Sequence, residues 1–350
     1  MRKAFIKKFL NIILSVFMAI GLFAVSAKTG SVDFSVKAET TATLATGRNF
    51  NATIKQLAGN SSAIYSSTDY NIKSFVHSTS APATGIATAD ISANQDGSVI
   101  AWFDNGTIYW YSDSDTVYMN ENSSDMFRGC YSLTSLDLSN FDTSKVTNMS
   151  MMFNSCIALT SLDVSGFDTS NATDMGSMFS NCHGLTSLDV SGFDTSNVTY
   201  MGGMFASCSS LTSLDVSNFA TSNATKMNSM FYDCGAIASL DVSNFDTSNV
   251  TDMGEMFSGC RALTSLDVSN FDTSNATDMG WMFQNCNTLQ TIYAGDLWST
   301  NKVTSSFNMF RNCNNLIGEL GTTYDSAHTN KEYAHIDGGT SNPGYFTAKS

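Results

Sequence analysis

Apolar and polar positions follow one pattern that repeats every 26 residues through the second half of the chain. Its clearest copy is LTSLDVSNFDTSNATDMGWMFQNC, which begins at Leu263. Near copies begin at Leu133, Leu159, Leu185, Leu211 and Ile237, and a degenerate copy begins at Leu289. The cysteines follow the same period: Cys130, Cys156, Cys182, Cys208, Cys234, Cys260 and Cys286, with Cys313 after a spacing of 27. A fixed period of this length is typical of proteins built from stacked units.

The first part of each repeat, numbered from its first Leu, predicts a strand. Positions 3 to 7 alternate polar and apolar residues, as in a strand with one solvent-exposed face. Positions 10 to 13 read Asp-Thr-Ser-Asn, side chains that hydrogen-bond nearby backbone in turns and helix caps. We expect the Asp-Thr-Ser run to hold the turn where leucine-rich repeats commonly carry a ladder of Asn residues.

The second part of each repeat predicts a short helix. Ala276, Met279, Met282, Phe283 and Cys286 recur at spacings that place them on one helical face. Asn275, at position 13, is a plausible N-cap for this helix. One strand and one short helix cannot bury their own apolar faces, whereas stacked copies can.

The predicted fold is therefore an α/β repeat solenoid. It is a leucine-rich-repeat-like right-handed coil with a parallel β-sheet on one side and short helices on the other, capped by an N-terminal β-hairpin region. Val99–Phe103 and Thr107–Tyr111 flank Asp104-Asn-Gly106 and predict that hairpin with a tight primed turn. Residues 48–59 have helical spacing and predict a short helix.

The chain begins with a positive segment, an apolar stretch and the small-residue sequence Val25-Ser26-Ala27. This order is typical of a secretory signal peptide, and a retained signal anchor is the alternative. The predicted organisation is a signal peptide at 1–27, an N-terminal region and cap at 28–106, a leucine-rich-repeat solenoid at 107–315 and a C-terminal cap at 316–350. We expect a secreted, extracellular or cell-surface bacterial protein, without membrane insertion after signal cleavage.

The repeat, together with the flanking segments DNGTIYWYS at 104–112 and DGGTSNPGYF at 337–346, resembles the BspA-type bacterial surface leucine-rich-repeat proteins. The resemblance covers about residues 40 to 346. It implies a secreted or surface-displayed adhesin that binds proteins or cells, and it implies no catalytic residue.

Composition and motifs narrow the function further. The net charge is −14 with no basic cluster, which argues against nucleic acid as a partner. The four histidines are scattered, and the chain carries no GxSxG, P-loop or dinucleotide motif, so we expect no enzyme, no cofactor and no metal site. We expect the recurring Asp residues of the repeats to be solvated and bonded to neighbouring Ser or Thr. Calcium held between these carboxylates is the alternative, although no EF-hand sequence is present.

Two further motifs have competing interpretations. The eight cysteines predict either disulfides, as in many secreted chains, or a buried column of reduced thiols, which their inward-facing positions favour. The Asn-x-Thr triplets match a glycosylation acceptor, but position 13 favours a capping role for the Asn. These triplets begin at Asn171, Asn197, Asn223, Asn249 and Asn275.

The candidate ligand-binding surface is the nearly invariant Ser-x-Asp-x-Ser segment at positions 3, 5 and 7. We call its residues the acidic face. They are Ser135, Asp137, Ser139, Ser161, Asp163, Ser165, Ser187, Asp189, Ser191, Ser213, Asp215, Ser217, Ser239, Asp241, Ser243, Ser265, Asp267 and Ser269. A second row of Asp lies at position 10. It consists of Asp142, Asp168, Asp194, Asp246 and Asp272, and Ala220 interrupts it.

Such a repetitive surface suits a repetitive ligand held by many weak contacts. The expected function is protein–protein binding or adhesion to host matrix, host cells or neighbouring bacteria. The alternative binding surface is a single hot spot on the variable side of the repeats, at Tyr232 or Trp281. The alternative function is a passive structural or surface-layer protein with weak self-association, and a cryptic enzyme is the remaining one.

Overall fold

The structure is a computed structural model that describes residues 27–28, 31–32, 39–60 and 67–349. The predicted signal peptide at 1–27 thus lies outside the described residues, apart from Ala27. The chain divides into two units, Met1–Thr41 and Ala42–Ser350. In the first unit, strands β1 (Ala27–Lys28) and β2 (Ser31–Val32) pair antiparallel.

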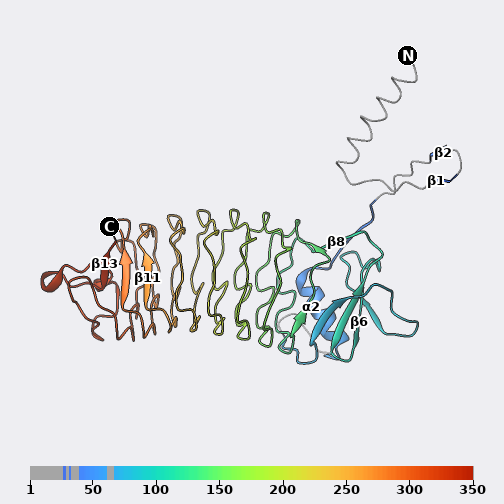
Figure 1. Ribbon diagram of the computed structural model, residues 1–350, viewed down its shortest axis with the longest axis horizontal. Coiled ribbons are helices and arrows are strands. Elements are labelled where there is room, and N and C mark those ends of the chain that lie inside the picture. Colours follow the sequence, from blue (N-terminus) through green and yellow to red (C-terminus); the bar gives the residue numbers. More distant parts are fainter. Residues whose placement is uncertain (1–26, 29–30, 33–38, 61–66, 350) are drawn as a thin grey trace, which may run out of the picture. The chain divides into compact units, whose positions relative to one another are not determined.

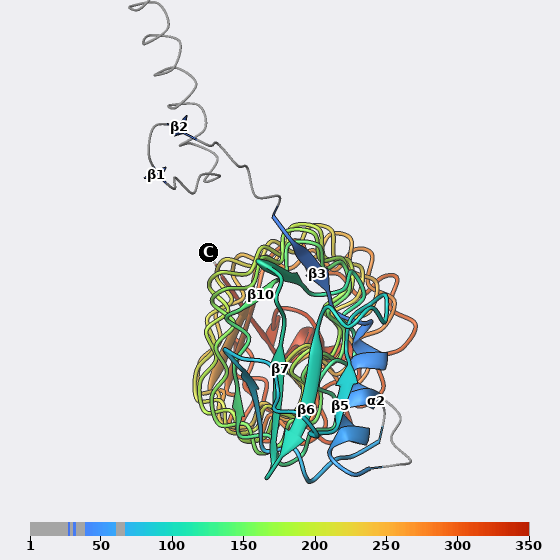
Figure 2. The same ribbon diagram turned by 90° about the vertical axis from the view of Figure 1, so that its right-hand side faces the viewer.

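The second unit begins with one helix and a small sheet. Helix α2 spans Gly47–Leu57, close to the predicted 48–59, and buries Phe50 and Ile54 one turn apart on its inner face. The sheet has the strand order β5-β6-β7-β4-β9. Its strands are β4 (Ser74–His77), β5 (Thr88–Asp90), β6 (Ile100–Asp104), β7 (Thr107–Tyr111) and β9 (Ser135–Leu136). Figure 2 shows α2 and strands β5, β6 and β7 across one end of the repeats.

The predicted hairpin is present as β6 and β7, which pair antiparallel from Ile100–Tyr111 to Asp104–Thr107. Asn105 and Gly106 at its tip have φ values of 44° and 91°, as a type I′ turn requires. The parallel pairing of β4 with β7 and with β9 connects the hairpin to the first repeat. A second small sheet has the order β10-β8-β3. Its strands are β3 (Thr41–Thr43), β8 (Thr116–Tyr118) and β10 (Phe141–Asp142).

The repeats form coils that stack one upon the next (Figure 1). Position 16 of each coil makes a parallel bridge to position 16 of the next. This column runs through Asn148, Asp174, Tyr200, Lys226, Asp252, Asp278 and Ser305. Beginning at position 17, the backbone N–H group of every second residue donates to a backbone carbonyl oxygen of the following coil. In one pair of coils these bonds are Met149 to Asp174 (2.9 Å), Met151 to Gly176 (2.9 Å) and Phe153 to Met178 (2.9 Å).

The predicted helices of the repeats are absent, and this part of the fold prediction was wrong. Positions 17 to 24 form overlapping tight turns instead, such as Met152 N–H to Met149 O (3.2 Å) and Cys156 N–H to Phe153 O (3.1 Å). A helix is not possible here because positions 19 and 23 have positive φ in every repeat, for example 56° at Ser177 and 61° at Asn181. The turns still direct the side chains of Met, Phe and Cys into the core. The spacing of these residues along the chain therefore matches that of one helix face.

The predicted parallel sheet is also only partly formed. Strands occur at the C-terminal end, where β11 (Ser265–Val268), β12 (Thr291–Ala294) and β13 (Phe346–Ala348) pair parallel. Between β9 and β11 the acidic face forms no strands. Stacked Phe side chains do not differ between the two parts. Phe179 and Phe205 lie 5.8 Å apart, and Phe283 and Phe310, in the coils that carry β11 and β12, lie 5.6 Å apart. The core therefore stacks in the same way whether or not the acidic face forms a ladder.

Polar columns join the coils around the remaining edges. The buried Thr at position 11 bonds to the next coil, as Thr169 Oγ1 does to Asp194 O at 3.0 Å. Each Asn at position 13 donates to the preceding coil, as Asn197 Nδ2 does to Ser170 O at 2.8 Å. Within the turn itself, Asp168 Oδ1 accepts from Ser170 N at 3.0 Å, so the Asp-Thr-Ser run holds the turn as predicted. The predicted N-cap role of this Asn was wrong, since there is no helix to cap.

The cysteines form a buried column of free thiols, as the inward positions predicted. Each thiol after the first donates to the carbonyl oxygen of a Phe in the preceding coil, for example Cys208 Sγ to Phe179 O at 3.2 Å. Burial raises the pKa of Cys182 to about 12. The chain ends in two short 3-10 helices, η1 (Lys331–Tyr333) and η2 (Gly339–Ser341), followed by β13.

Candidate functional site

The acidic face is held by a turn that each Asp makes with the Ser two residues later. Asp163 Oδ1 accepts from Ser165 N at 3.0 Å and from Ser165 Oγ at 2.7 Å. The same Asp–Ser contact to the backbone N–H recurs in all six copies, at 2.9 to 3.1 Å. The predicted bonding of these carboxylates to neighbouring Ser is confirmed. One carboxylate oxygen of each Asp therefore has a structural role.

The contacts with Ser favour the ionised form of the exposed carboxylates. The hydroxyl and N–H of Ser165 lower the pKa of Asp163, and Ser217 does the same for Asp215. Asp163, Asp189, Asp215 and Asp241 are exposed, whereas Asp137 and Asp267 are half-buried. The acidic face thus presents a column of charges to solvent, spaced by one coil.

The second oxygen, Oδ2, differs between the last coil and the others. At Asp267, Oδ2 accepts a hydrogen bond from Nζ of Lys349, which follows β13. In the part of the chain that the structure describes, Oδ2 of Asp163, Asp189 and Asp215 has no hydrogen-bond partner. Partial burial would raise the pKa of Asp267, but hydrogen bonds from Lys349 and Ser269 outweigh it and lower that pKa. The acidic face therefore already accommodates one lysine side chain, which the sequence pattern had not indicated.

Glycine at position 8 hollows the acidic face near its start. Asn218 at this position donates to Ser191 O in the preceding coil at 2.8 Å, but Gly166 leaves the corresponding space open. The result is a cavity of about 290 Å³. Its lining includes Asp137, Ser139, Asp163, Ser165 and Gly166. The first two coils therefore bring two carboxylates and two serines of the predicted site to one hollow.

The position-10 Asp row makes the same contacts with Ser on a different edge of the coils. Asp168 Oδ1 accepts from Ser170 N at 3.0 Å and from its hydroxyl at 2.6 Å, and these bonds lower the pKa of Asp168. Asp246 bonds to Ser248 in the same way. This row has similar chemistry at another place, which makes it a natural control for the acidic face.

The two residues of the alternative hot spot, Tyr232 and Trp281, differ in exposure and in packing. Tyr232 is 38% exposed, while Trp281 is half-buried and packs edge-on against Phe307 at 5.8 Å. Phe307 is 60% exposed and was not singled out from the sequence. Tyr232 stands at position 22, and Trp281 stands at position 19, where the backbone φ is 55°. The two side chains lie two coils apart, so they do not form one compact cluster.

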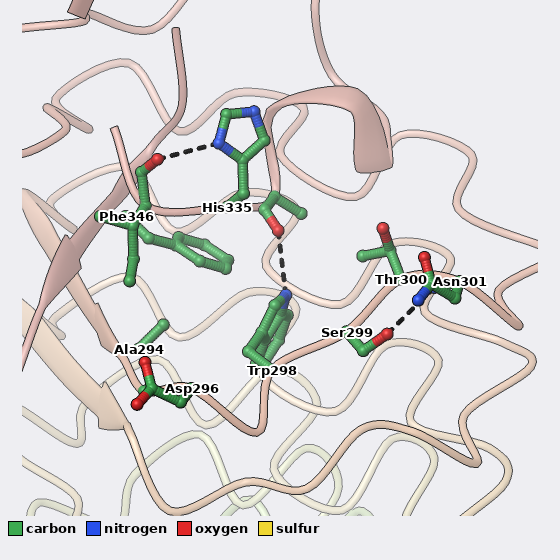
Figure 3. A pocket seen from close by; sticks show the side chains of 11 residues that line it. Ala294, Asp296, Trp298, Ser299, Thr300, Asn301, His335 and Phe346 are labelled. Atoms are coloured by element: carbon green, nitrogen blue, oxygen red, sulfur yellow. Dashed lines mark hydrogen bonds between the residues drawn. The ribbon is translucent and has the colours of Figure 1, made fainter. Parts of the chain in front are cut away.

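A further cavity, of about 330 Å³, lies beside the degenerate seventh repeat (Figure 3). Trp298, Phe346 and His335 contribute to its lining. The sequence signal was the departure of this copy from the repeat, which we had interpreted only as degeneration.

No arrangement of metal ligands is seen among the described residues, where no three His, Cys, Asp or Glu side chains are placed to hold one ion. None of the described helices has both the length and the apolar character that crossing a membrane requires.

Comparison with known proteins gives a family but no function. A family model described as "Mycoplasma protein of unknown function, DUF285" matches the chain twice, over residues 121–240 and 204–324. Neither a curated protein nor a solved structure matches the chain. The two matches overlap and together cover more than half of the chain, all of it in the stacked repeats. The chain therefore belongs to the family described as Mycoplasma protein of unknown function, DUF285.

Proposed function

We propose that this protein is a binding module that holds basic segments of other proteins on its acidic face. The observation that carries the proposal is the contact between Lys349 and Asp267. One oxygen of that carboxylate belongs to the turn with Ser269, and the other receives the ammonium. The other five Asp residues make the same Ser contact and leave the second oxygen for a ligand. Each site is weak because exposed ion pairs contribute only about 0 to 1 kcal/mol.

Because the same weak contact recurs in successive coils, a ligand that spans several coils can bind with a higher overall affinity. A lysine-rich ligand that engages several coils makes each further contact as an intramolecular event. Neighbouring registers are nearly equivalent because the Ser-x-Asp-x-Ser segment hardly changes from Ser135 to Ser269. Such binding suits adhesion to host matrix, host cells or neighbouring bacteria. It needs no cofactor and no catalytic residue, so we propose a non-enzymatic role.

The setting that we propose is the outside of a bacterial cell. The predicted signal peptide at 1–27 and the similarity of the repeat to BspA-type surface proteins support a secreted or surface-displayed protein. Within this proposal the stacked coils are a right-handed, leucine-rich-repeat-like solenoid in which tight turns replace the helices. The partners are protein or cell-surface ligands, not nucleic acid.

The second candidate is a passive structural or surface-layer role. It is favoured by the fact that Asp Oδ1 and Ser already have a structural use in every coil, for example Asp189 with Ser191 at 2.9 Å. That use alone would keep the Ser-x-Asp-x-Ser segment unchanged. Under this account the second oxygens have no ligand, and the protein associates weakly with itself.

A charge-matched comparison separates the two candidates. Asn can accept the same hydrogen bond through its own Oδ1, so replacing all six Asp of the acidic face by Asn keeps the turns and removes only charge. The control variant replaces the five Asp at position 10 by Asn, which removes nearly as much charge from another edge. Binding of a biotinylated ten-lysine peptide is measured by biolayer interferometry, with a ten-glutamine peptide as the neutral probe.

We expect the six-residue variant to lose about tenfold or more of its affinity for the lysine peptide. We expect the five-residue variant to lose much less, and raising the salt concentration to weaken wild-type binding. Equal losses in the two variants would mean that net charge alone attracts the peptide. That result, or an absence of binding to the wild-type protein, would favour the passive role. If the acidic face binds the peptide as expected, capture of partners from matrix, host-cell and bacterial-surface extracts would identify the natural ligand.

A further inference from the structure

The seventh repeat differs in sequence and in packing at the position where all the other copies carry a buried Phe. Its segment Ala294-Gly-Asp-Leu-Trp298 replaces Val-Ser-Asn-Phe-Asp of the preceding copy. Leu297, which stands in the place of the Phe, is 56% exposed. Trp298 turns inward instead and packs edge-on against Phe346, with ring centroids 5.0 Å apart. Its Nε1 donates to Ala334 O at 3.0 Å, which fixes the indole in place.

This change opens the cavity of about 330 Å³ between the seventh repeat and the C-terminal tail. Gly295 allows the chain to turn closely there, because a Cβ atom would lie 2.3 Å from Ser269 O. Figure 3 shows Trp298 and Phe346 facing the space, with Asp296, His335 and the Ser299–Asn301 segment around them. The volume is at the lower end of the roughly 300–1,000 Å³ typical of small-molecule sites, which suits a single ring.

Four polar groups around the cavity have no hydrogen-bond partner within the described chain. They are the carboxylate of Asp296, the hydroxyl of Thr300, the side-chain amide of Asn301 and Nε2 of His335. His335 Nδ1 lies 2.9 Å from Ile336 O and must be the donor there, because a carbonyl oxygen only accepts. Nε2 of the neutral imidazole is therefore an acceptor. The cavity thus offers both donors and acceptors that fold stability does not use.

The charges near the cavity do not select a charged ligand. Asp296 would repel an anion. Lys331 Nζ donates to Val303 O at 2.5 Å and to Thr300 O at 3.4 Å, so its positive charge lies next to the wall at Thr300 and offsets part of the attraction that Asp296 would have for a cation. A neutral ligand with one apolar face and an edge of hydroxyl groups fits the remaining chemistry. Aromatic side chains provide the apolar surface, and the free amide, hydroxyl and carboxylate match groups that both donate and accept.

We infer that this cavity binds one ring of a neutral carbohydrate. The C–H face of the sugar lies against Trp298, and its hydroxyl groups bond to Asp296, Asn301 and Nε2 of His335. This activity goes beyond the proposed binding of basic protein segments, because none of these residues belongs to the acidic face.

The test uses the full protein with defined probes. The methyl glycosides of glucose, galactose, mannose and N-acetylglucosamine are compared with choline as a cation and inorganic phosphate as an anion. Saturation-transfer NMR detects binding, and tryptophan fluorescence measures its affinity. Asp296→Asn and Asn301→Ala change exposed side chains and should leave the fold intact. Asp246→Asn removes a charge elsewhere and is the matched control, and Trp298→Phe assigns the fluorescence signal.

We expect at least one glycoside to bind, with an affinity in the millimolar range that is usual for a single exposed ring contact. Asp296→Asn or Asn301→Ala should weaken it about tenfold, the loss expected for an unpaired polar group, while Asp246→Asn has no effect. The fluorescence change should disappear in Trp298→Phe. Binding of none of the glycosides, preference for choline or phosphate, or equal binding by all variants would overturn the inference. Lysine-peptide binding should be unchanged in these cavity variants, so this result is independent of the acidic face.

Discussion

Thr169 connects two coils because its hydroxyl bonds to both the backbone C=O and the backbone N–H of Asp194 in the next coil. Its buried Oγ1 donates to Asp194 O at 3.0 Å and accepts from Asp194 N at 2.8 Å. Thr169→Val keeps the β-branched shape and removes both bonds. A neutral hydrogen bond contributes about 1 kcal/mol net, and a donor or acceptor left unpaired costs about 1–3 kcal/mol. Because water reaches part of Asp194, we expect the free energy of unfolding to fall by about 2 kcal/mol.

The matched control is Thr173→Val. Thr173 is exposed, and its hydroxyl makes one longer bond, to Thr147 O at 3.2 Å. Its loss should cost about 0.5 kcal/mol or less. Urea unfolding followed by circular dichroism measures both variants, and neighbouring coils should unfold together because each coil contacts only its neighbours. If Thr169→Val is no less stable than Thr173→Val, the polar columns do not hold the stack together.

One labelling experiment and three substitutions test other parts of the structure. The eight thiols should be unreactive toward a thiol reagent in the native protein and all react after denaturation, because burial raises the pKa of groups such as Cys182 to about 12. Ser155→Gly should stabilise the protein by up to about 1 kcal/mol in thermal unfolding, since Ser155 has a φ of 64°. Gly259→Ala should destabilise it by about 1 kcal/mol or more, because φ is 77° and the new Cβ would lie 3.0 Å from Asp233 Oδ1. Burial would raise the pKa of Asp337, but hydrogen bonds from Thr322, Gly339 and Leu320 outweigh it and lower that pKa. Its contribution is therefore present above the unfolded pKa of about 3.9 and is lost as the pH falls below it, so Asp337→Asn should matter at pH 7 and matter less near pH 3 in acid-unfolding curves.

Periodicity was sufficient to predict which residues are buried. Met279, Met282, Phe283 and Cys286 lie inside the coil, as their spacing indicated. The Asn-Gly turn of the hairpin could be predicted because it depends on local chemistry. Both predictions use short-range patterns that the three-dimensional structure preserves.

The helix prediction failed because the same spacing also fits consecutive tight turns. The missed signal was position 23, where Ser, Asn, Asp and Gly alternate among the copies, as at Asn181 and Gly259. These residues tolerate positive φ, which a helix interior does not allow. The cavity beside Trp298 could not be derived from the repeat, because it requires the C-terminal tail to pack against the seventh copy. The contact of Lys349 with Asp267 joins residues 82 positions apart for the same reason.

We propose that binding is distributed along the acidic face and not concentrated on the variable side of the coils. The deciding experiment compares the affinity of the ten-lysine peptide for the wild-type protein, for the six-Asp variant and for Trp281→Ala, in the same buffer. We expect Trp281→Ala to bind like the wild-type protein and the six-Asp variant to bind much more weakly. Loss of binding in Trp281→Ala, with normal binding by the six-Asp variant, would contradict this proposal.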